Sequence, residues 1–186
     1  MKKVLCGLFA TLSLLALGTV YAEEETVHAK WWKNLCGADE NPLMLNVWGM
    51  SHHPYSKYKF NERNWGLGLR CNHKMSFFGE RWSSEVNMVK NSVRGKTLFG
   101  GSGAEYKIAE MGGLSLYLGG ALSAMAYEHP LKHKTLYGIL AVPTAAIELP
   151  NKMALRAFII PSSGEHKVTA YVFYMSIPFD AFFNTK

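Results

Sequence analysis

The sequence lacks several features that would assign it to common classes of protein. After residue 22 no hydrophobic run approaches the 20 or so apolar residues of a membrane-spanning helix. Its basic residues are scattered and form no stripe, which argues against a nucleic-acid-binding surface. There is no Cys-x-x-Cys pair, and the adjacent His52 and His53 would point to opposite faces of a strand. We therefore expect no metal and no cofactor.

The first 22 residues have the pattern of a secretory signal peptide. Lys2 and Lys3 precede an apolar stretch, and Val20-Tyr21-Ala22 resembles a cleavage site. Cleavage after Ala22 would leave one domain, residues 23–186. Its formal charge falls from +6 to +4 because Lys2 and Lys3 are lost. That excess is compatible with contact to anionic lipid headgroups.

Two cysteines remain after cleavage, Cys36 and Cys71. In an oxidising compartment they could form a disulfide, or they could be two unrelated buried thiols. The segment 26–36 is the best candidate for a helix, with Val27, Trp31 and Leu35 at four-residue spacing. Such a short amphipathic helix could lie on a membrane or pack against the protein itself.

The rest of the chain reads as strands separated by turn residues. Its 13% aromatic content and 17 glycines favour strands over a helical bundle. The polar stretch 51–64 is predicted to be an external loop. Eight strands are expected at about 43–50, 65–72, 81–92, 96–108, 113–126, 135–149, 152–160 and 166–178.

Eight antiparallel strands after a signal peptide predict an all-β fold, a small closed β-barrel. In residues 65–71, Trp65, Leu67 and Leu69 alternate with Gly66 and Gly68. We expect the large side chains to face outward and the glycines to leave room inside. An outer-membrane barrel and a soluble lipocalin-like barrel share this alternation, so both remain open.

Several stretches together resemble the outer-membrane lipid A palmitoyltransferase family, PagP. Residues 60–66, Phe-Asn-Glu-Arg-Asn-Trp-Gly, are similar to its Tyr-Asn-Glu-Arg-Pro-Trp-Gly. The other matching stretches are 89–92 (Val-Lys-Asn-Ser), 101–103 (Gly-Ser-Gly), 140–143 (Leu-Ala-Val-Pro) and 159–161 (Ile-Ile-Pro). The resemblance covers most of residues 23–186.

The resemblance implies an eight-stranded barrel with a short N-terminal amphipathic helix, acting as a monomer in the cell outer membrane. It implies transfer of a palmitoyl chain from a phospholipid to lipid A, with the acyl chain held in an interior cavity. Gly103 matches the family's glycine at the cavity floor, and we expect Gly66 and Gly68 to border the same space. Pro143 and Pro161 match prolines that loosen strand pairing for lateral access of lipid. Asn64 replaces another proline, so one access route is in doubt.

The family's catalytic groups are a histidine, an aspartate and a serine. Ser92 matches the serine, Asn91 stands in place of the aspartate, and either His52 or His53 matches the histidine. A histidine can act as general base, and an asparagine can orient it without supplying charge. The chain has only two aspartates, so a glutamate such as Glu62 or Glu85 would have to supply any acid.

Two other functions remain open. Asn91, the short loop and the tail after Phe179 fit a non-enzymatic exported barrel, either structural or binding an apolar ligand, in the outer membrane or the periplasm. Outer-membrane barrels usually end on an aromatic residue, and this chain continues to Lys186. An exported hydrolase would use similar serine and histidine chemistry with water as acceptor.

Overall fold

The structure is a computed structural model, and it describes residues 36, 43–54, 56, 59–73, 81–130, 133–161 and 169–182. The expected signal peptide lies outside the described residues, as does the expected helix 26–36 apart from Cys36. No helix in the described part is long and apolar enough to span a membrane.

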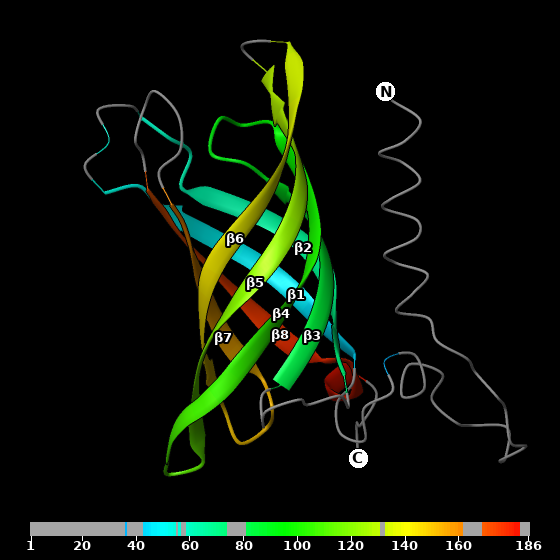
Figure 1. Cartoon of the computed structure of the whole chain (residues 1–186), viewed down its shortest axis with the longest axis vertical. Helices are drawn as coiled ribbons and strands as arrows, with labels where there is room; N and C mark the ends of the chain where they lie inside the picture. Colours follow the sequence, from blue (N-terminus) through cyan, green and yellow to red (C-terminus); the bar gives the residue numbers. More distant parts are fainter. Residues whose placement is uncertain are drawn as a thin grey trace, which may run out of the picture.

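Eight strands follow one another along the chain and confirm the expected number and order (Figure 1). They are β1 (Leu43–His52), β2 (Arg63–Asn72), β3 (Arg81–Lys90), β4 (Lys96–Met111), β5 (Leu114–His129), β6 (Lys134–Glu148), β7 (Ala154–Ile160) and β8 (Ala170–Pro178).

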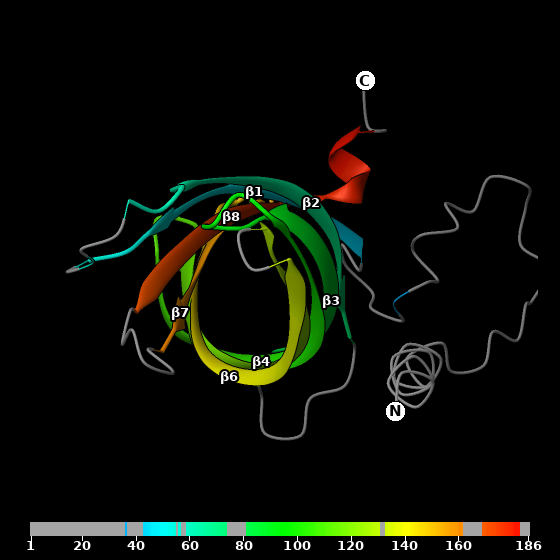
Figure 2. The same ribbon diagram turned by 90° about the horizontal axis from the view of Figure 1, so that it is seen from above.

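Each strand pairs antiparallel with the next, and β1 pairs with β8 to close the barrel. The ring is visible when the molecule is viewed from above (Figure 2). A register shift between Trp48 and Met50 marks a bulge in β1. Such a bulge re-aims the following side chains and increases the local twist. The all-β closed barrel is therefore confirmed.

The alternation of side chains in β2 and β3 is as expected. Trp65, Leu67 and Leu69 are exposed on the outer wall, whereas Gly66 is buried. In β3, Ser83 and Asn87 are buried inside while Val86 and Met88 face out. Together with the other strands, the outer wall carries many large exposed apolar side chains, including Leu98, Leu118, Leu122, Ile139, Ile147, Leu155, Ile159, Tyr171 and Met175.

Part of the interior is filled by buried charges. Glu105 of β4 accepts from Arg156 (Nη1 to Oε1, 2.5 Å) and from Arg81 (Nη2 to Oε2, 2.9 Å). Arg70 Nη2 lies 3.1 Å from Glu105 Oε2, and Arg70 Nη1 lies 3.5 Å from Glu85 Oε2. These contacts link β2, β3, β4 and β7 across the barrel, and they neutralise charges that would be costly to bury alone.

The ladder between β6 and β7 is short. It runs from Glu148↔Ala154 to Thr144↔Phe158 and stops there. β6 continues from Pro143 back to Lys134 while paired with β5, and Ile159 and Ile160 pair with β8. The barrel wall therefore loses its β6–β7 hydrogen bonds at Pro143, which has no amide hydrogen for a ladder.

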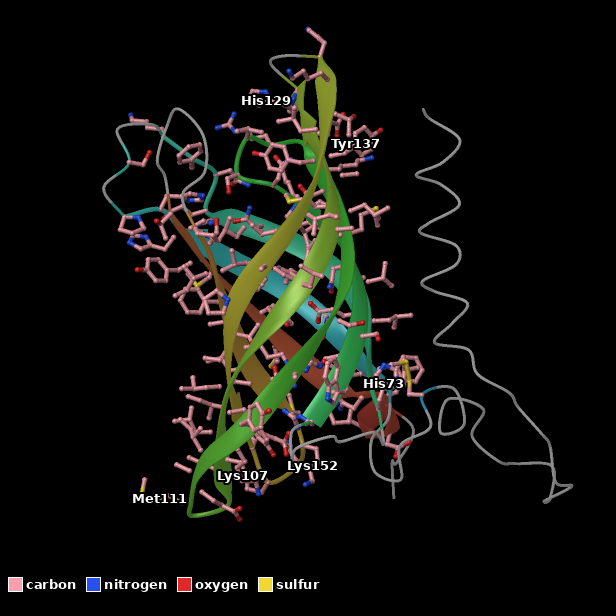
Figure 3. The ribbon with its side chains drawn as sticks, viewed as in Figure 1. His73, Lys107, Met111, His129, Tyr137 and Lys152 are labelled. Atoms are coloured by element: carbon pink, nitrogen blue, oxygen red, sulfur yellow. A yellow bond between two sulfur atoms is a disulfide. The ribbon has the colours of Figure 1, made fainter. Side chains whose placement is uncertain are left out.

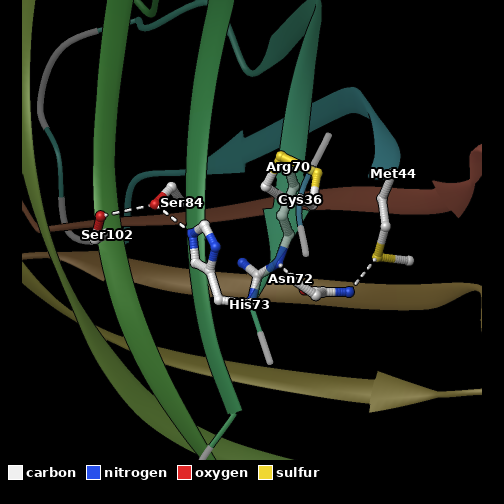
Figure 4. The surroundings of a disulfide bond; sticks show 8 residues. Cys36, Met44, Arg70, Asn72, His73, Ser84 and Ser102 are labelled. Carbon is white, nitrogen blue, oxygen red and sulfur yellow. Dashed lines mark hydrogen bonds between the residues drawn. A yellow bond between two sulfur atoms is a disulfide. The ribbon is translucent and has the colours of Figure 1, made fainter. Parts of the chain in front are cut away.

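A disulfide joins Cys36 to Cys71 at the end of β2, with Cα atoms 5.2 Å apart, so the open question of pairing is settled (Figure 4). Beside it, His73 Nε2 bonds Ser84 Oγ at 2.8 Å, and Ser84 Oγ lies 3.0 Å from Ser102 Oγ. Burial lowers the pKa of His73, and a hydrogen bond to the main chain of Cys36 opposes that shift. After β8, residues Phe179–Phe182 form one 3-10 turn outside the barrel (Figure 2).

Candidate functional site: a cavity at one end of the barrel

An interior cavity of about 270 Å³ opens at the end of the barrel that carries the β1–β2 and β3–β4 connections. Antiparallel topology places the β5–β6 turn at the same end, which Figure 3 marks with His129 and Tyr137. Lys107, Met111 and Lys152 mark the opposite end (Figure 3). We call the first end the mouth. The volume is slightly below the range of about 300–1,000 Å³ usual for small-molecule sites.

The cavity wall is mainly apolar and aromatic. Trp48 stacks on Tyr174, with centroids 4.4 Å apart and planes inclined by 6°. Phe99 and Phe158 pack edge-on against Trp48, at 5.0 and 5.6 Å. Further apolar lining comes from Val89, Met125, Leu140, Val142, Ile160, Ala170 and Val172. This wall suits a hydrocarbon chain.

The inner end of the cavity is charged. Arg70, Glu85 and Glu105 belong to the lining, and Tyr174 donates its hydroxyl to Glu85 Oε2 at 3.3 Å. Trp48 donates Nε1–H to Asn87 Oδ1 at 2.9 Å, directly below the aromatic group. The cavity therefore has apolar walls between two polar ends. The charged floor could not be predicted from the sequence beyond inward-facing residues on separate strands.

Polar residues surround the mouth. Ser51 donates to Asn64 Oδ1 at 2.6 Å, and its Oγ lies 3.5 Å from Ser92 Oγ. The Asn61 amide donates to the Ser92 carbonyl at 2.8 Å, which fastens the β1–β2 connection to the β3–β4 turn. Ser92 thus lines the cavity beside two groups, Ser51 and Asn64, that sequence reasoning did not include in the catalytic set.

The two candidate histidines have different environments. His53 lines the cavity and packs on Phe60, with ring centroids 4.5 Å apart. The pKa of His53 lies below its usual value, mainly because the side chain is buried. The Glu62 carboxylate opposes this shift, and His52 adds to it. Among the residues that the structure describes, the buried Nδ1 of His53 has no hydrogen-bond partner. His52 is exposed outside the cavity lining, with Nδ1 3.3 Å from Glu62 Oε1. Of the two, His53 shares the cavity with Ser92.

Asn91 is occupied by the β3–β4 turn. Its side-chain amide donates to the carbonyls of Glu128 (2.7 Å) and Lys96 (3.2 Å). Its Oδ1 accepts from the amides of Gly95 (2.8 Å) and Val93 (3.1 Å). None of its hydrogen bonds within the described residues reaches either histidine. An aspartate could not donate to those carbonyls, which gives asparagine a structural role here.

The glycines expected to border an acyl chain differ in their placement. Gly103 lines the cavity, whereas Gly66 and Gly68 do not belong to its lining. A Cβ on Gly66 would collide with Met88 and Val89, and one on Gly68 would collide with Asn87. The expectation that these two leave open room is corrected, because side chains and main chain of β3 already fill it.

Pro143 lies directly beyond the end of the β6–β7 ladder, which stops at Thr144↔Phe158. Pro161 directly follows β7. Leu140, Val142 and Thr144 of β6 and Phe158 and Ile160 of β7 line the cavity on either side of this gap. The stretch of wall in which the described residues form no β6–β7 pairs therefore borders the cavity.

Within the described part, no three His, Cys, Asp or Glu side chains group as a potential metal site. No protein-family model and no curated protein matches the sequence. Among solved structures, the chain is similar to Ail, the attachment invasion locus protein of Yersinia pestis. The TM-score is 0.42 and the identity 14%, over 72% of this chain and 94% of that one. A likeness this distant carries no functional argument.

Proposed function

We propose that this chain is an outer-membrane β-barrel that binds the hydrocarbon chain of a lipid in its interior cavity. The observation that carries the proposal is the apolar cavity inside a closed barrel whose outer wall is itself apolar. A soluble barrel has a polar outer face, and soluble proteins rarely expose a continuous apolar surface of this kind. In a membrane, closure also leaves no strand edge exposed to lipid along most of the ring.

The gap beside Pro143 supplies a lateral path for such a chain. Among the described residues, pairing between β6 and β7 stops at Thr144↔Phe158, and the part of β6 beyond it, which pairs with β5 alone, borders the cavity. On the outer wall, a shallow depression lies over residues 120–122 and 141–143 of β5 and β6. A lipid tail could pass from this outer surface into the cavity without crossing the polar mouth.

Binding can be tested with folded protein in detergent and a lysophospholipid, measured by calorimetry. Val142 lines the cavity, so we expect Val142→Trp to fill it and abolish binding. Ile139 lies on the outer wall of the same strand, so Ile139→Trp is the matched control and should bind normally. Equal binding by the wild type and Val142→Trp would refute the proposal.

Acyl transfer from a phospholipid to lipid A is a second candidate, favoured because His53 and Ser92 both line the mouth of the cavity. Neutral His53 could take the proton of an acceptor hydroxyl as its oxygen attacks the ester carbonyl, then pass it to the departing lysophospholipid. Ser92 would help to position the reacting groups.

Mass spectrometry of lipid A from cells that express the protein tests this second candidate. We expect one added palmitoyl chain for the wild type and for His52→Ala, and none for His53→Ala or Ser92→Ala. Unmodified lipid A with the wild type folded in the membrane would exclude transfer and leave a non-enzymatic barrel. Release of free fatty acid instead would identify water as the acceptor.

A further inference from the structure

Four basic residues lie on the outside of the barrel near the mouth. Arg63 begins β2, Lys90 ends β3, Lys96 begins β4, and Arg94 lies in the turn between the last two strands. Their neighbours Asn64, Val89 and Thr97 are buried inside. Because successive strand residues face opposite sides, the three strand cations face outward. We call Arg63, Lys90, Arg94 and Lys96 the basic rim.

The basic rim lies directly above the apolar outer wall. Each of the three strand cations has an exposed apolar side chain two residues away on the same face. These are Trp65 (68% exposed) below Arg63, Met88 (60%) below Lys90 and Leu98 (46%) below Lys96. One such step along a strand is about 7 Å. If the apolar wall contacts lipid tails, the cations reach the level of the headgroups, where lipid phosphates lie.

Two features of the basic rim would destabilise the folded protein if no ligand were bound there. Lys90 and Lys96 are direct cross-strand partners, and like charges in this position repel. Arg94 has φ of 68°, a left-handed conformation that non-glycine residues adopt at a cost. An anion between the lysines would replace repulsion with attraction, so the pair is better explained by a ligand than by stability.

The two carboxylates nearest in sequence or pairing to the basic rim bond to other groups. Glu62 pairs with His52, and Glu128 Oε2 accepts from the main-chain amide of Lys96 at 3.0 Å. Across the residues that the structure describes, no ion pair involves a side chain of the basic rim. At the opposite end, by contrast, Lys107 lies 2.7 Å from Glu110 and Lys152 lies 3.7 Å from Glu148.

We propose that the basic rim binds the phosphate of a lipid headgroup in the membrane leaflet at the mouth end. The phosphate would lie between Lys90 and Lys96, and Arg63 and Arg94 would flank it with planar guanidinium donors suited to phosphate oxygens. The inference rests on the membrane orientation under the proposed function. The proposed phosphate site lies on the outer wall, a surface separate from the cavity.

Native mass spectrometry of the folded protein in detergent tests the site. The probe is diphosphorylated lipid A, compared with the same lipid after removal of both phosphates. Each cation near a membrane surface contributes about fivefold to anion affinity, so Lys90→Gln/Lys96→Gln should bind the phosphorylated lipid about 30-fold more weakly at low salt. Lys107→Gln/Lys152→Gln at the opposite end removes the same charge and should match the wild type.

Three results would overturn the inference. One is equal affinity of wild type and Lys90→Gln/Lys96→Gln, and another is equal binding of the two lipids. Displacement of the lipid by inorganic phosphate at the same concentration would show a site for free phosphate instead. Flotation with phospholipid vesicles checks membrane insertion separately. If the protein does not insert, the proposed function is refuted as well. If it inserts but binds both lipids equally, only the proposed phosphate site on the basic rim is refuted.

Discussion

Asn87 occupies the space that a side chain on Gly68 would need. The two residues face each other across β2 and β3, and the Asn87 oxygen accepts from Trp48 Nε1 at 2.9 Å and Asn46 Nδ2 at 3.0 Å. Gly68 therefore leaves room for a polar group, the Asn87 amide, to hydrogen-bond the aromatic cluster at Trp48.

Gly68→Ala should destabilise the barrel, because the added Cβ would collide with the Asn87 side chain and the Val86 carbonyl. Overpacking of this kind costs about 1–3 kcal/mol. Urea unfolding in detergent, followed by tryptophan fluorescence, measures the loss. Gly138→Ala is the control, since nothing lies within 4 Å of its added Cβ. Equal stability of the two variants would contradict the packing argument.

Asn91→Asp distinguishes a structural from a catalytic asparagine. The carboxylate cannot donate to the carbonyls of Glu128 and Lys96, so we expect a loss of about 1–3 kcal/mol in the free energy of unfolding. If Asn91 instead stands in for a catalytic aspartate, the variant should increase acyl transfer. Urea unfolding and lipid A mass spectrometry on the same protein separate these outcomes.

The buried charges at the floor should depend on one another. Arg156 is 1% exposed and donates to Glu105 and, at 2.9 Å, to Ser176 Oγ. Arg156→Met leaves Glu105 short of a partner, and breaking such a buried pair costs about 3–5 kcal/mol. Lys107→Gln breaks the exposed pair with Glu110 and should leave stability nearly unchanged, because solvent screens exposed pairs. A similar result for both would show that the interior charges are hydrated.

His53 should titrate below the usual pKa of histidine, since burial disfavours its charged form. The folded state then binds fewer protons than the unfolded state, so His53 contributes stability above the unfolded pKa of ~6.5 that is lost as the pH falls through its lower folded pKa. NMR titration of the imidazole measures the shift. A midpoint at or above the value for an unfolded peptide would contradict it, and His52→Ala should leave the direction unchanged.

Removal of the disulfide should weaken attachment of the segment before β1. Cys36 and Cys71 are separated by 35 positions, and in the loop-entropy account a bridge of this span stabilises by about 3–4 kcal/mol. We expect Cys36→Ser/Cys71→Ser to unfold at lower urea concentration than the oxidised wild type. The reduced wild type should behave as the double variant does; a large difference between them would point to effects of the substitutions themselves.

The candidate site was only partly predictable from the sequence. The motif with Ser92 and the His-His pair located the mouth, but the choice between His52 and His53 depended on the direction of each side chain after the bulge in β1. The motif predicts a catalytic role for Asn91 but does not show which hydrogen bonds its amide makes in the β3–β4 turn. Ser51 and Arg70 gave no local signal, since their partners come from distant strands.

The sequence by itself determined the local structure of this protein: eight strands, their order, and an alternation that separates an apolar outer wall from a more polar interior. That follows because strand side chains alternate with period two and turn residues interrupt the runs. Only the tertiary structure decided what the interior contains. Closure of the ring brings Trp48, Phe99, Phe158 and Tyr174 together above Arg70 and Glu105. Contacts between strands that are far apart in sequence depend on register and barrel shape, which no single strand carries.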